Sequence, residues 1–150
     1  MVDNKPISIA SDHAGFALKS KIIDYLTKKN IPYNDLGTYS ADSVDYPDYA
    51  FKVADSINKK IAKYAILICN TGLGMSIAAN RFTGIRAALC ADDNEASSAK
   101  KHNNANVLVL SAQKLNHQDF SPILGAWLGA SFEKGRHERR VNKIENLAKI

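Results

Sequence analysis

A cysteine at the end of an apolar run is the most informative chemical feature of this sequence. Cys69 closes the run AILIC at 65–69 and is followed by NTGLG at 70–74. A short apolar run that ends near glycines is typical of a buried parallel strand, and residues 76–81 behind it have a helical pattern. The thiol would then lie at the carboxyl end of a strand, beside free backbone N–H groups that favour negative charge. Free cysteines are also common core residues, so the segment alone leaves a reactive and a structural role open.

Other polar residues are placed to share a site with this thiol. Asp12 and His13 directly follow a short apolar strand pattern at 7–11, and Thr71 follows Cys69. Open parallel sheets bind ligands at the carboxyl ends of their strands, so these side chains can share one crevice if the two strands are close. The glycines of the GLG turn at 72–74 suit an anion-binding loop, although such a turn is weak evidence by itself.

Basic residues gather near the end of the chain. Arg136 and Arg140 are spaced to lie on one face of a helix, where two guanidinium groups can hold phosphate oxygens. A solvated helix face and a nucleic-acid patch are the alternatives for such a charge cluster. Acidic residues are interspersed and no aromatic residue lies among the arginines, which argues against nucleic acid. The opposite stripe of this helix is expected to pack on the core or across a dimer seam: Val141, Ile144, Leu147 and Ala148.

Length and composition limit the possible classes of protein. The chain has 150 residues and a net charge of +5, which predicts one domain over residues 1–150. Cys69 and Cys90 form no CxxC pair, and the four histidines are scattered without an HExxH motif, so neither a disulfide framework nor a metal site is predicted. The N-terminal residues do not resemble a signal peptide, and no apolar run reaches the length of a membrane span. We therefore expect a cytoplasmic protein without a membrane partner.

Strand and helix patterns alternate along the whole chain. Strands are predicted at 7–11, 33–36, 65–69, 85–91 and 107–110, and helices at 19–29, 47–61, 76–81, 92–103, 119–132 and 136–149. This alternation predicts a three-layer α/β/α sandwich around a five-stranded parallel sheet, which is a Rossmann-like or flavodoxin-like fold. The first and third strands must be neighbours if Asp12 and Cys69 share a crevice. We therefore expect a strand order that begins 2-1-3, such as the flavodoxin-like order or 2-1-3-5-4.

Six segments of the chain resemble one known family in order and spacing. They are SDHAGF at 11–16, DYPDYA at 45–50, CNTGLGMSIAAN at 69–80, GIRA at 84–87, HNNANV at 102–107 and GRHERRV at 135–141. Together they resemble the type B ribose-5-phosphate isomerases. The resemblance implies an aldose–ketose isomerase of the non-oxidative pentose phosphate pathway that needs no metal or other cofactor. It also implies a homodimer, or a dimer of dimers, whose active sites draw on both subunits.

The resemblance assigns roles to particular residues. A helix N-terminus or a nearby cation can lower the pKa of the Cys69 thiol toward the operating pH, and the resemblance implies that this thiol carries a proton between C2 and C1 of ribose 5-phosphate through an enediolate. It implies that His102 protonates the ring oxygen, that Thr71 contacts the substrate or orients the thiol, and that Asp12 contacts sugar hydroxyls or assists ring opening. The implied substrate-binding residues are His13, Tyr46, Asn70, Gly72, Gly74, Asn103, Arg136 and Arg140.

Each of these assignments has a simpler structural alternative. Asp12 and Thr71 are also ordinary helix caps, Tyr46 can pack at the start of its helix, and His102 suits the end of a helix. Because His102 precedes the fifth strand, it reaches the carboxyl edge of the sheet only if its loop folds back or a partner subunit presents it.

Two departures from the family pattern and several rival functions remain. Gln113 stands where the family often has a phosphate-binding Arg, although Lys114 is adjacent, and Asn70 replaces a common Gly.

A cysteine-dependent phosphatase would need an arginine at the position of Met75. A nucleotide-binding or flavin-binding module would need a GxGxxG motif or a Walker lysine, and this sequence has neither. The strongest alternative is an isomerase of a six-carbon phosphosugar, such as allose 6-phosphate or galactose 6-phosphate.

Overall fold

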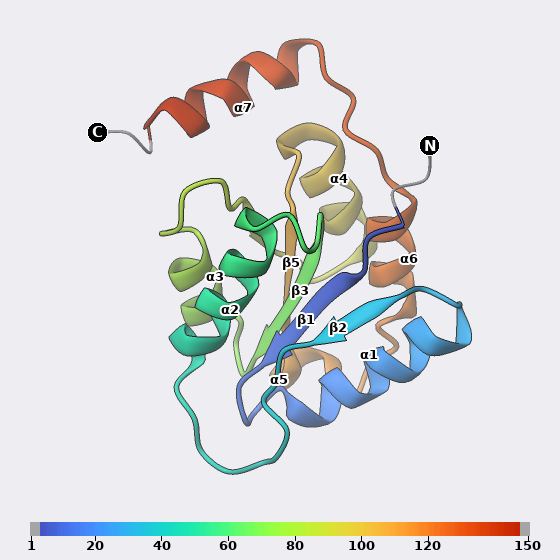
Figure 1. Cartoon of the computed structure of the whole chain (residues 1–150). Coiled ribbons are helices and arrows are strands. Elements are labelled where there is room, and N and C mark those ends of the chain that lie inside the picture. The colour runs from blue at the N-terminus through green and yellow to red at the C-terminus, as the bar shows by residue number, and fades with distance from the viewer. Residues whose placement is uncertain (1–3, 148–150) are drawn as a thin grey trace.

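The computed structural model describes residues 4–147, and Figure 1 shows a central sheet with helices around it. Along the chain the elements are β1 (Ile7–Ser11), α1 (Phe16–Lys28), β2 (Tyr33–Asp35), α2 (Tyr46–Asn58), β3 (Ala65–Cys69), α3 (Leu73–Ala79), β4 (Ala87–Leu89), α4 (Asp93–Asn103), β5 (Val107–Ser111), α5 (Ala112–Leu115), α6 (Ser121–Gly129) and α7 (Arg136–Leu147).

The five strands form one parallel sheet in the order β2-β1-β3-β5-β4. The prediction of an order beginning 2-1-3 is therefore confirmed. The three central strands, β1, β3 and β5, are five residues long and buried throughout, whereas the edge strands β2 and β4 are three residues long and half-buried. This difference explains the near-continuous apolar sequences of the central strands, because helices cover both of their faces.

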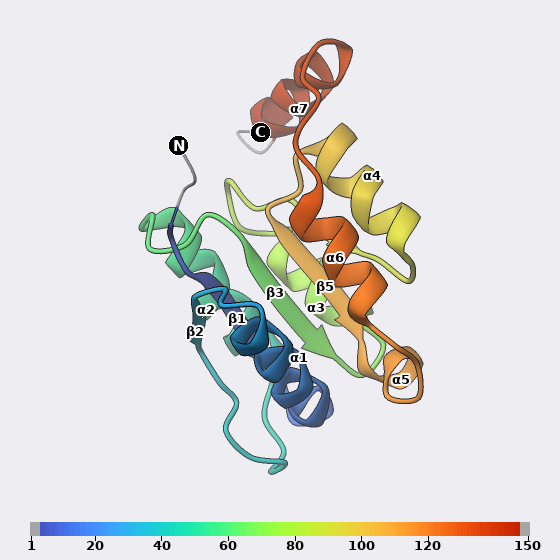
Figure 2. The ribbon, with the colours of Figure 1, turned by 90° about the vertical axis from the view of Figure 1, so that its right-hand side faces the viewer.

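Helices cover the sheet on both sides, as the view in Figure 2 shows. Apolar side chains of α1, α4 and α6 pack on one face, which includes Ile66 and Ile68 of β3. Those of α2 and α3 pack on the other face, which includes Leu67 and Cys69. The alternation along β3 thus directs Cys69 toward the side of the sheet that α2 and α3 cover.

Several element boundaries differ from the prediction. Helix α3 begins at Leu73 rather than at 76, because Gly72 has a left-handed backbone (φ 82°) that lets the helix follow the strand after a very short turn. Strand β4 is shorter than predicted, and α6 ends at Gly129. Helix α5 was not predicted, and the Ser111 side chain caps it by accepting from the Lys114 N–H. The predicted end of the last helix at 149 lies outside the described residues.

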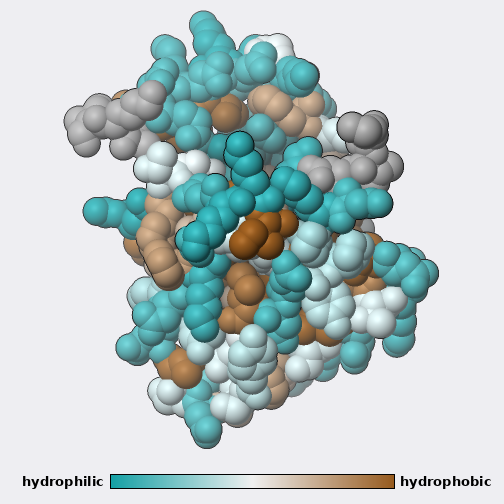
Figure 3. All heavy atoms as spheres, in the orientation of Figure 1, coloured by the Kyte–Doolittle hydropathy of each residue, from teal (hydrophilic) through white to brown (hydrophobic). Residues whose placement is uncertain are grey.

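The surface seen in Figure 3, in the orientation of Figure 1, is mostly hydrophilic with hydrophobic groups between. Within residues 4–147, none of the helices combines the length and the apolar character that crossing a bilayer requires.

Gly15 sets the distance between the start of α1 and the central strand β3. A Cβ atom at this position would lie 2.7 Å from Ile68 Cγ2 and 2.8 Å from the Ile68 carbonyl oxygen. We expect Gly15→Ala to lower the free energy of unfolding by about 1–3 kcal/mol, since the backbone must shift to relieve this overlap. Urea unfolding followed by circular dichroism measures the change.

Gly125 provides the matched control for this substitution. It lies inside α6, and a Cβ atom there would meet no heavy atom within 4 Å other than its chain neighbours and the backbone of its own helix. Gly125→Ala is therefore expected to stabilise the protein by about 0.5–1 kcal/mol through the higher helix propensity of alanine. Equal stability of the Gly15→Ala variant and the unmodified protein would show that the contact with Ile68 is not tight.

Candidate active site

Cys69 lies at the carboxyl end of β3 and is 4% exposed. Its Sγ accepts a hydrogen bond from the backbone N–H of Gly72 at 3.1 Å. The N–H groups of Met75 and Thr71 also lower the pKa of this thiol. The expected arrangement of a thiol beside backbone donors at the carboxyl edge of the sheet is therefore present.

The pKa of Cys69 is nevertheless raised, whereas its place before a helix predicted a lowered pKa. Burial raises the pKa of the thiol above its ordinary value, and the carboxylate of Asp12 raises it further. The backbone donors offset part of this effect. Since burial outweighs the donors, Cys69 of the isolated chain is a neutral thiol near pH 7.

This protonation state predicts how the two cysteines react with iodoacetamide. Alkylation of Cys69 should be slow at pH 7 and should accelerate by about tenfold per pH unit up to pH 9, because the thiolate is the reactive form. Cys90 should stay unmodified in the folded protein, since burial raises its pKa to about 12. Mass spectrometry of tryptic peptides measures both rates. A Cys69 rate that is already constant below pH 7 would show a lowered pKa instead.

Asp12 and His13 leave β1 beside Cys69 at the same edge. Asp12 is 6% exposed, and its Oδ1 accepts from the Gly15 N–H at 3.0 Å, which closes the turn before α1. Gly15 is the N-cap of α1, so the carboxylate is not the helix cap that was the structural alternative. His13 Nδ1 accepts from the Val44 N–H at 3.2 Å, which joins the loop before α2 to this edge. The proton of neutral His13 must then be on Nε2, which leaves this nitrogen as a donor.

Tyr46 and Thr71 complete the surroundings of the thiol. Tyr46, at the start of α2, lies against Gly74, since a Cβ atom at Gly74 would be 2.6 Å from the tyrosine ring. The Tyr46 side chain remains partly exposed. Thr71 Oγ1 accepts from the Leu73 N–H at 3.2 Å, a local turn contact that leaves the hydroxyl hydrogen free to donate elsewhere.

A pocket of about 380 Å³ lies next to this loop. It is lined by Thr71, Leu73, Leu89, Ser111, Gln113 and Lys114. The carbonyl of Asn70 accepts from Ser111 Oγ and from the Gln113 N–H, both at 2.9 Å, so α5 is tied to the Cys69 loop. Gln113 is thus near the predicted site, and Lys114 lines the same pocket as a cation.

The remaining predicted site residues lie at the opposite end of the sheet: His102, Asn103, Arg136 and Arg140. Asn104, with a left-handed backbone, leads α4 into the amino end of β5, whereas Cys69 pairs with Ser111 at the carboxyl end. Five strand residues, or about 15 Å of extended chain, separate these ends. Helix α7 lies beyond the amino ends of the strands in Figure 1, where Glu145 pairs with Arg86 just before β4. The loop after α4 does not fold back, so a single chain does not bring His102 to Cys69.

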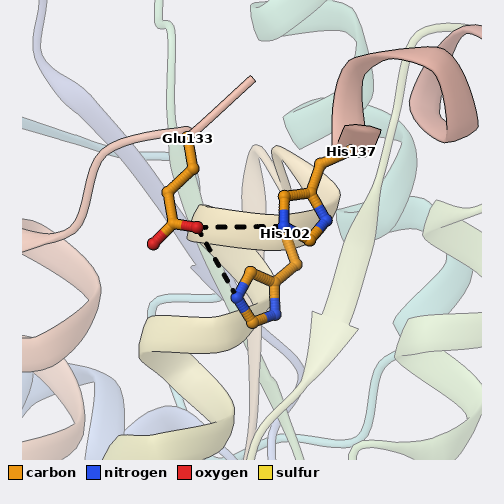
Figure 4. A group of neighbouring side chains, drawn as sticks. All are labelled: His102, Glu133 and His137. Carbon is orange, nitrogen blue, oxygen red and sulfur yellow. Dashed lines mark ion pairs between the residues drawn. The ribbon is translucent and has the colours of Figure 1, made fainter. Parts of the chain in front are cut away.

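A group that the sequence did not predict lies at this amino end. His102 and His137 stack with their ring centroids 4.5 Å apart, and Glu133 Oε2 lies 3.9 Å and 3.8 Å from their Nε2 atoms (Figure 4). Burial lowers the pKa of His137, and the neighbouring His102 and Arg136 lower it further. The interpretation of the histidines as scattered was wrong for these two. The four-residue spacing of Glu133 and His137 was the available signal, but nothing local indicated that α4 ends beside them.

The fold and the site together define an α/β protein with a thiol at the switch point of a parallel sheet. A protein-family model described as Ribose/Galactose Isomerase matches residues 7–144. The chain therefore belongs to the ribose/galactose isomerase family.

Individual relatives extend this result. The chain is 41% identical over 140 residues to ribose-5-phosphate isomerase B of Escherichia coli, covering 93% of this chain and 94% of the relative. The structure of a ribose 5-phosphate isomerase of Thermotoga maritima aligns with a TM-score of 0.91 at 53% identity, covering 95% of this chain and 98% of that one. A ribose-5-phosphate isomerase B of Mycoplasma genitalium, solved with bound ribulose-5-phosphate, aligns with a TM-score of 0.89 at 43% identity and covers 96% of each chain.

Proposed function

We propose that this chain is an aldose–ketose isomerase that interconverts ribose 5-phosphate and ribulose 5-phosphate. The observation that carries the proposal is the Cys69 thiol, held at the carboxyl edge of the sheet by the Gly72 N–H. The Mycoplasma genitalium relative, solved with bound ribulose-5-phosphate, supports this choice of sugar. The whole chain acts as one isomerase domain in this proposal, in the cytoplasm and in the non-oxidative pentose phosphate pathway.

The reaction needs a group that moves a proton between two adjacent carbons. In the proposed mechanism Cys69 removes the C2 proton as a thiolate and returns it to C1, so that the enediolate is the intermediate. The backbone N–H groups around Gly72 and Gly74, together with the Thr71 hydroxyl, stabilise the negative charge on the enediolate oxygens. Because burial raises the Cys69 pKa in the free chain, the proposed mechanism has the thiol lose its proton in the complete site, where substrate is bound.

The sugar and its phosphate need further contacts. His13 donates from Nε2 to the phosphate, while Asp12, Asn70 and Tyr46 contact the sugar at the carboxyl edge. Lys114 supplies positive charge at the pocket where Gln113 replaces the arginine that is frequent in the family.

Ring opening and the main phosphate grip are proposed to come from a second copy of the chain. His102 protonates the ring oxygen, Asn103 contacts a hydroxyl, and Arg136 and Arg140 hold the phosphate. The length of β5, about 15 Å of extended chain, separates the end of the sheet that carries these residues from the end that carries Cys69. A twofold homodimer that places the α4–α7 end of one subunit at the carboxyl edge of the other would complete two equal sites.

Exposed apolar side chains support this homodimer. Leu73 and Ile77 of α3 are 60% and 68% exposed, and they lie next to the Cys69 loop. On α7, Val141 is buried, whereas Ile144 and Leu147 are exposed, so the predicted apolar stripe is mostly uncovered within one chain. Ala148 lies outside the described residues. Contact between these two surfaces across a dimer seam would bury both and would bring Arg136 and Arg140 toward the partner's thiol.

A comparison of three substrates tests the proposed function. We expect kcat/KM for ribose 5-phosphate to exceed that for allose 6-phosphate and galactose 6-phosphate by about tenfold or more, because an added carbon must be accommodated in a pocket built for a shorter chain. The rate should persist in the presence of a chelator. A higher kcat/KM on either six-carbon sugar would assign the chain to that substrate instead.

A further inference from the structure

The group formed by His102, Glu133 and His137 offers three metal-ligand atoms close to one another. Its two imidazole nitrogens and one carboxylate oxygen all lie within 4.8 Å of one another (Figure 4). In a tetrahedral zinc site with bonds of about 2.0–2.1 Å, ligand atoms lie about 3.3 Å apart. The two carboxylate–imidazole distances of 3.9 and 3.8 Å therefore need to close by about half an ångström, and no pair of ligand atoms needs to close by more than about 1.5 Å, for the three side chains to share one ion.

The backbone around the three ligands is held in place. The Glu133 N–H donates to the Lys101 carbonyl at 3.0 Å, which ties the segment before α7 to the last turn of α4. The His137 N–H donates to the Lys134 carbonyl at 3.1 Å and forms the turn that starts α7. His102 thus lies at the end of α4 and His137 in the first turn of α7, and the segment between α6 and α7 that carries Glu133 is hydrogen-bonded to α4.

The side chains themselves retain the freedom to adjust. His102 and Glu133 are 45% and 51% exposed, whereas His137 is 11% exposed. The two rings are stacked and nearly parallel, at 14°, so their nitrogen lone pairs lie in two separate planes and do not meet at one point. Binding therefore requires the exposed His102 ring to turn toward Glu133 while His137 stays in place.

We propose that His102, Glu133 and His137 form a binding site for Zn²⁺ or a similar transition-metal ion, and that the bound ion inhibits the enzyme. Two histidines and one glutamate with an open fourth position are a common zinc ligand set. Hard ions such as Mg²⁺ and Ca²⁺ prefer several oxygen ligands, and this group has one carboxylate. The nearby Lys134, Arg136 and Arg140 oppose any cation, which favours ions that bind imidazole strongly.

Inhibition follows from the role of His102 and rests on the proposed function, whereas binding does not. A metal ion on His102 Nε2 occupies the lone pair that would carry the proton to the sugar ring oxygen. The ion would also place positive charge and a water ligand at the end of the molecule that is proposed to face the partner's substrate. The proposed isomerase mechanism uses no metal, so removal of the ion should restore full turnover.

Cobalt titration of untagged protein tests the binding site directly. Co²⁺ bound by two histidines and a glutamate should give the visible absorption of a four-coordinate or five-coordinate ion, and Zn²⁺ should displace it. Glu133→Gln and His137→Gln should each weaken Co²⁺ binding by at least roughly tenfold, the loss typical of altering even an outer-shell partner. His117→Gln and Glu138→Gln are matched controls, since both residues are exposed and lie outside the group, and they should bind as the unmodified protein does. Equal Co²⁺ binding by all variants would overturn the proposed site. If the His137→Gln variant does not fold because His137 is buried, the Glu133→Gln variant still tests the site, since Glu133 is exposed.

Kinetics in the same solutions test the inhibition. Zn²⁺ should reduce turnover of ribose 5-phosphate, and EDTA should reverse the loss. The Glu133→Gln variant should require at least roughly tenfold more Zn²⁺ for the same fractional loss of turnover, where each variant is compared with its own metal-free rate. Cobalt binding that leaves turnover unchanged would overturn the inhibitory role of the site. An active enzyme that binds no cobalt would overturn the metal site and leave the proposed function standing, whereas a metal-binding protein without isomerase activity would contradict the proposed function instead.

Discussion

Cys69→Ala is expected to lower kcat for ribose 5-phosphate by about 10³-fold, because alanine has no group that can move the C2 proton. Substrate should still bind, since the backbone N–H groups, the phosphate contacts and the sugar contacts remain. Coupled spectrophotometric assay measures the rate, and calorimetry with ribulose 5-phosphate measures binding. Cys69→Ser should be nearly as inactive, because a hydroxyl loses its proton far less readily than a thiol.

Cys90→Ala is the matched control for this substitution. Cys90 is also a buried free cysteine, but it follows the edge strand β4, and its pKa of about 12 makes it chemically inert near neutral pH. We expect this variant to retain most of the activity and to lose about 1 kcal/mol of stability from the small cavity. Residual turnover in Cys69→Ala comparable to that of Cys90→Ala would remove Cys69 from the mechanism.

Two inactive variants should restore each other's activity if the site is shared between subunits. In a heterodimer of Cys69→Ala and His102→Asn subunits, one site carries both substitutions, whereas the other combines an unmodified Cys69 with an unmodified His102. Such a heterodimer is expected to have about half of the wild-type activity, because one of its two equal sites is complete. The two homodimeric variants should each be at least about 10²-fold slower than wild type on the cyclic substrate.

Isolation of the heterodimer makes the complementation test unambiguous. The two subunits can be produced together with two different peptide tags, so that purification through both tags selects the mixed species. A heterodimer of Cys69→Ala with the Cys69→Ala, His102→Asn double variant is the control, since neither of its sites has a thiol. Purified heterodimers of the first kind that remain inactive would contradict the shared site and would require His102 to act within its own chain.

The sequence by itself determined the central sheet and half of the candidate site. The apolar runs at 7–11 and 65–69 became β1 and β3 with the predicted bounds, since strands buried on both faces are marked by their composition. The assumption that Asp12 and Cys69 share a crevice also predicted that the strand order begins 2-1-3, as the structure has it. Asp12, Cys69 and Thr71 are close because they end neighbouring strands, which is a consequence of topology alone.

The tertiary structure decided the protonation of Cys69 and the surroundings of His102. A backbone donor next to a thiol can be recognised from local sequence, but burial depends on what α2, α3 and the sheet place around it, and here burial raises the pKa. The stacking of His102 on His137 likewise depends on where α7 lies relative to α4, which no local pattern specifies. Hydrogen bonds within a turn join residues that are close in sequence, whereas burial and side-chain clusters depend on the packing of elements that are far apart in sequence.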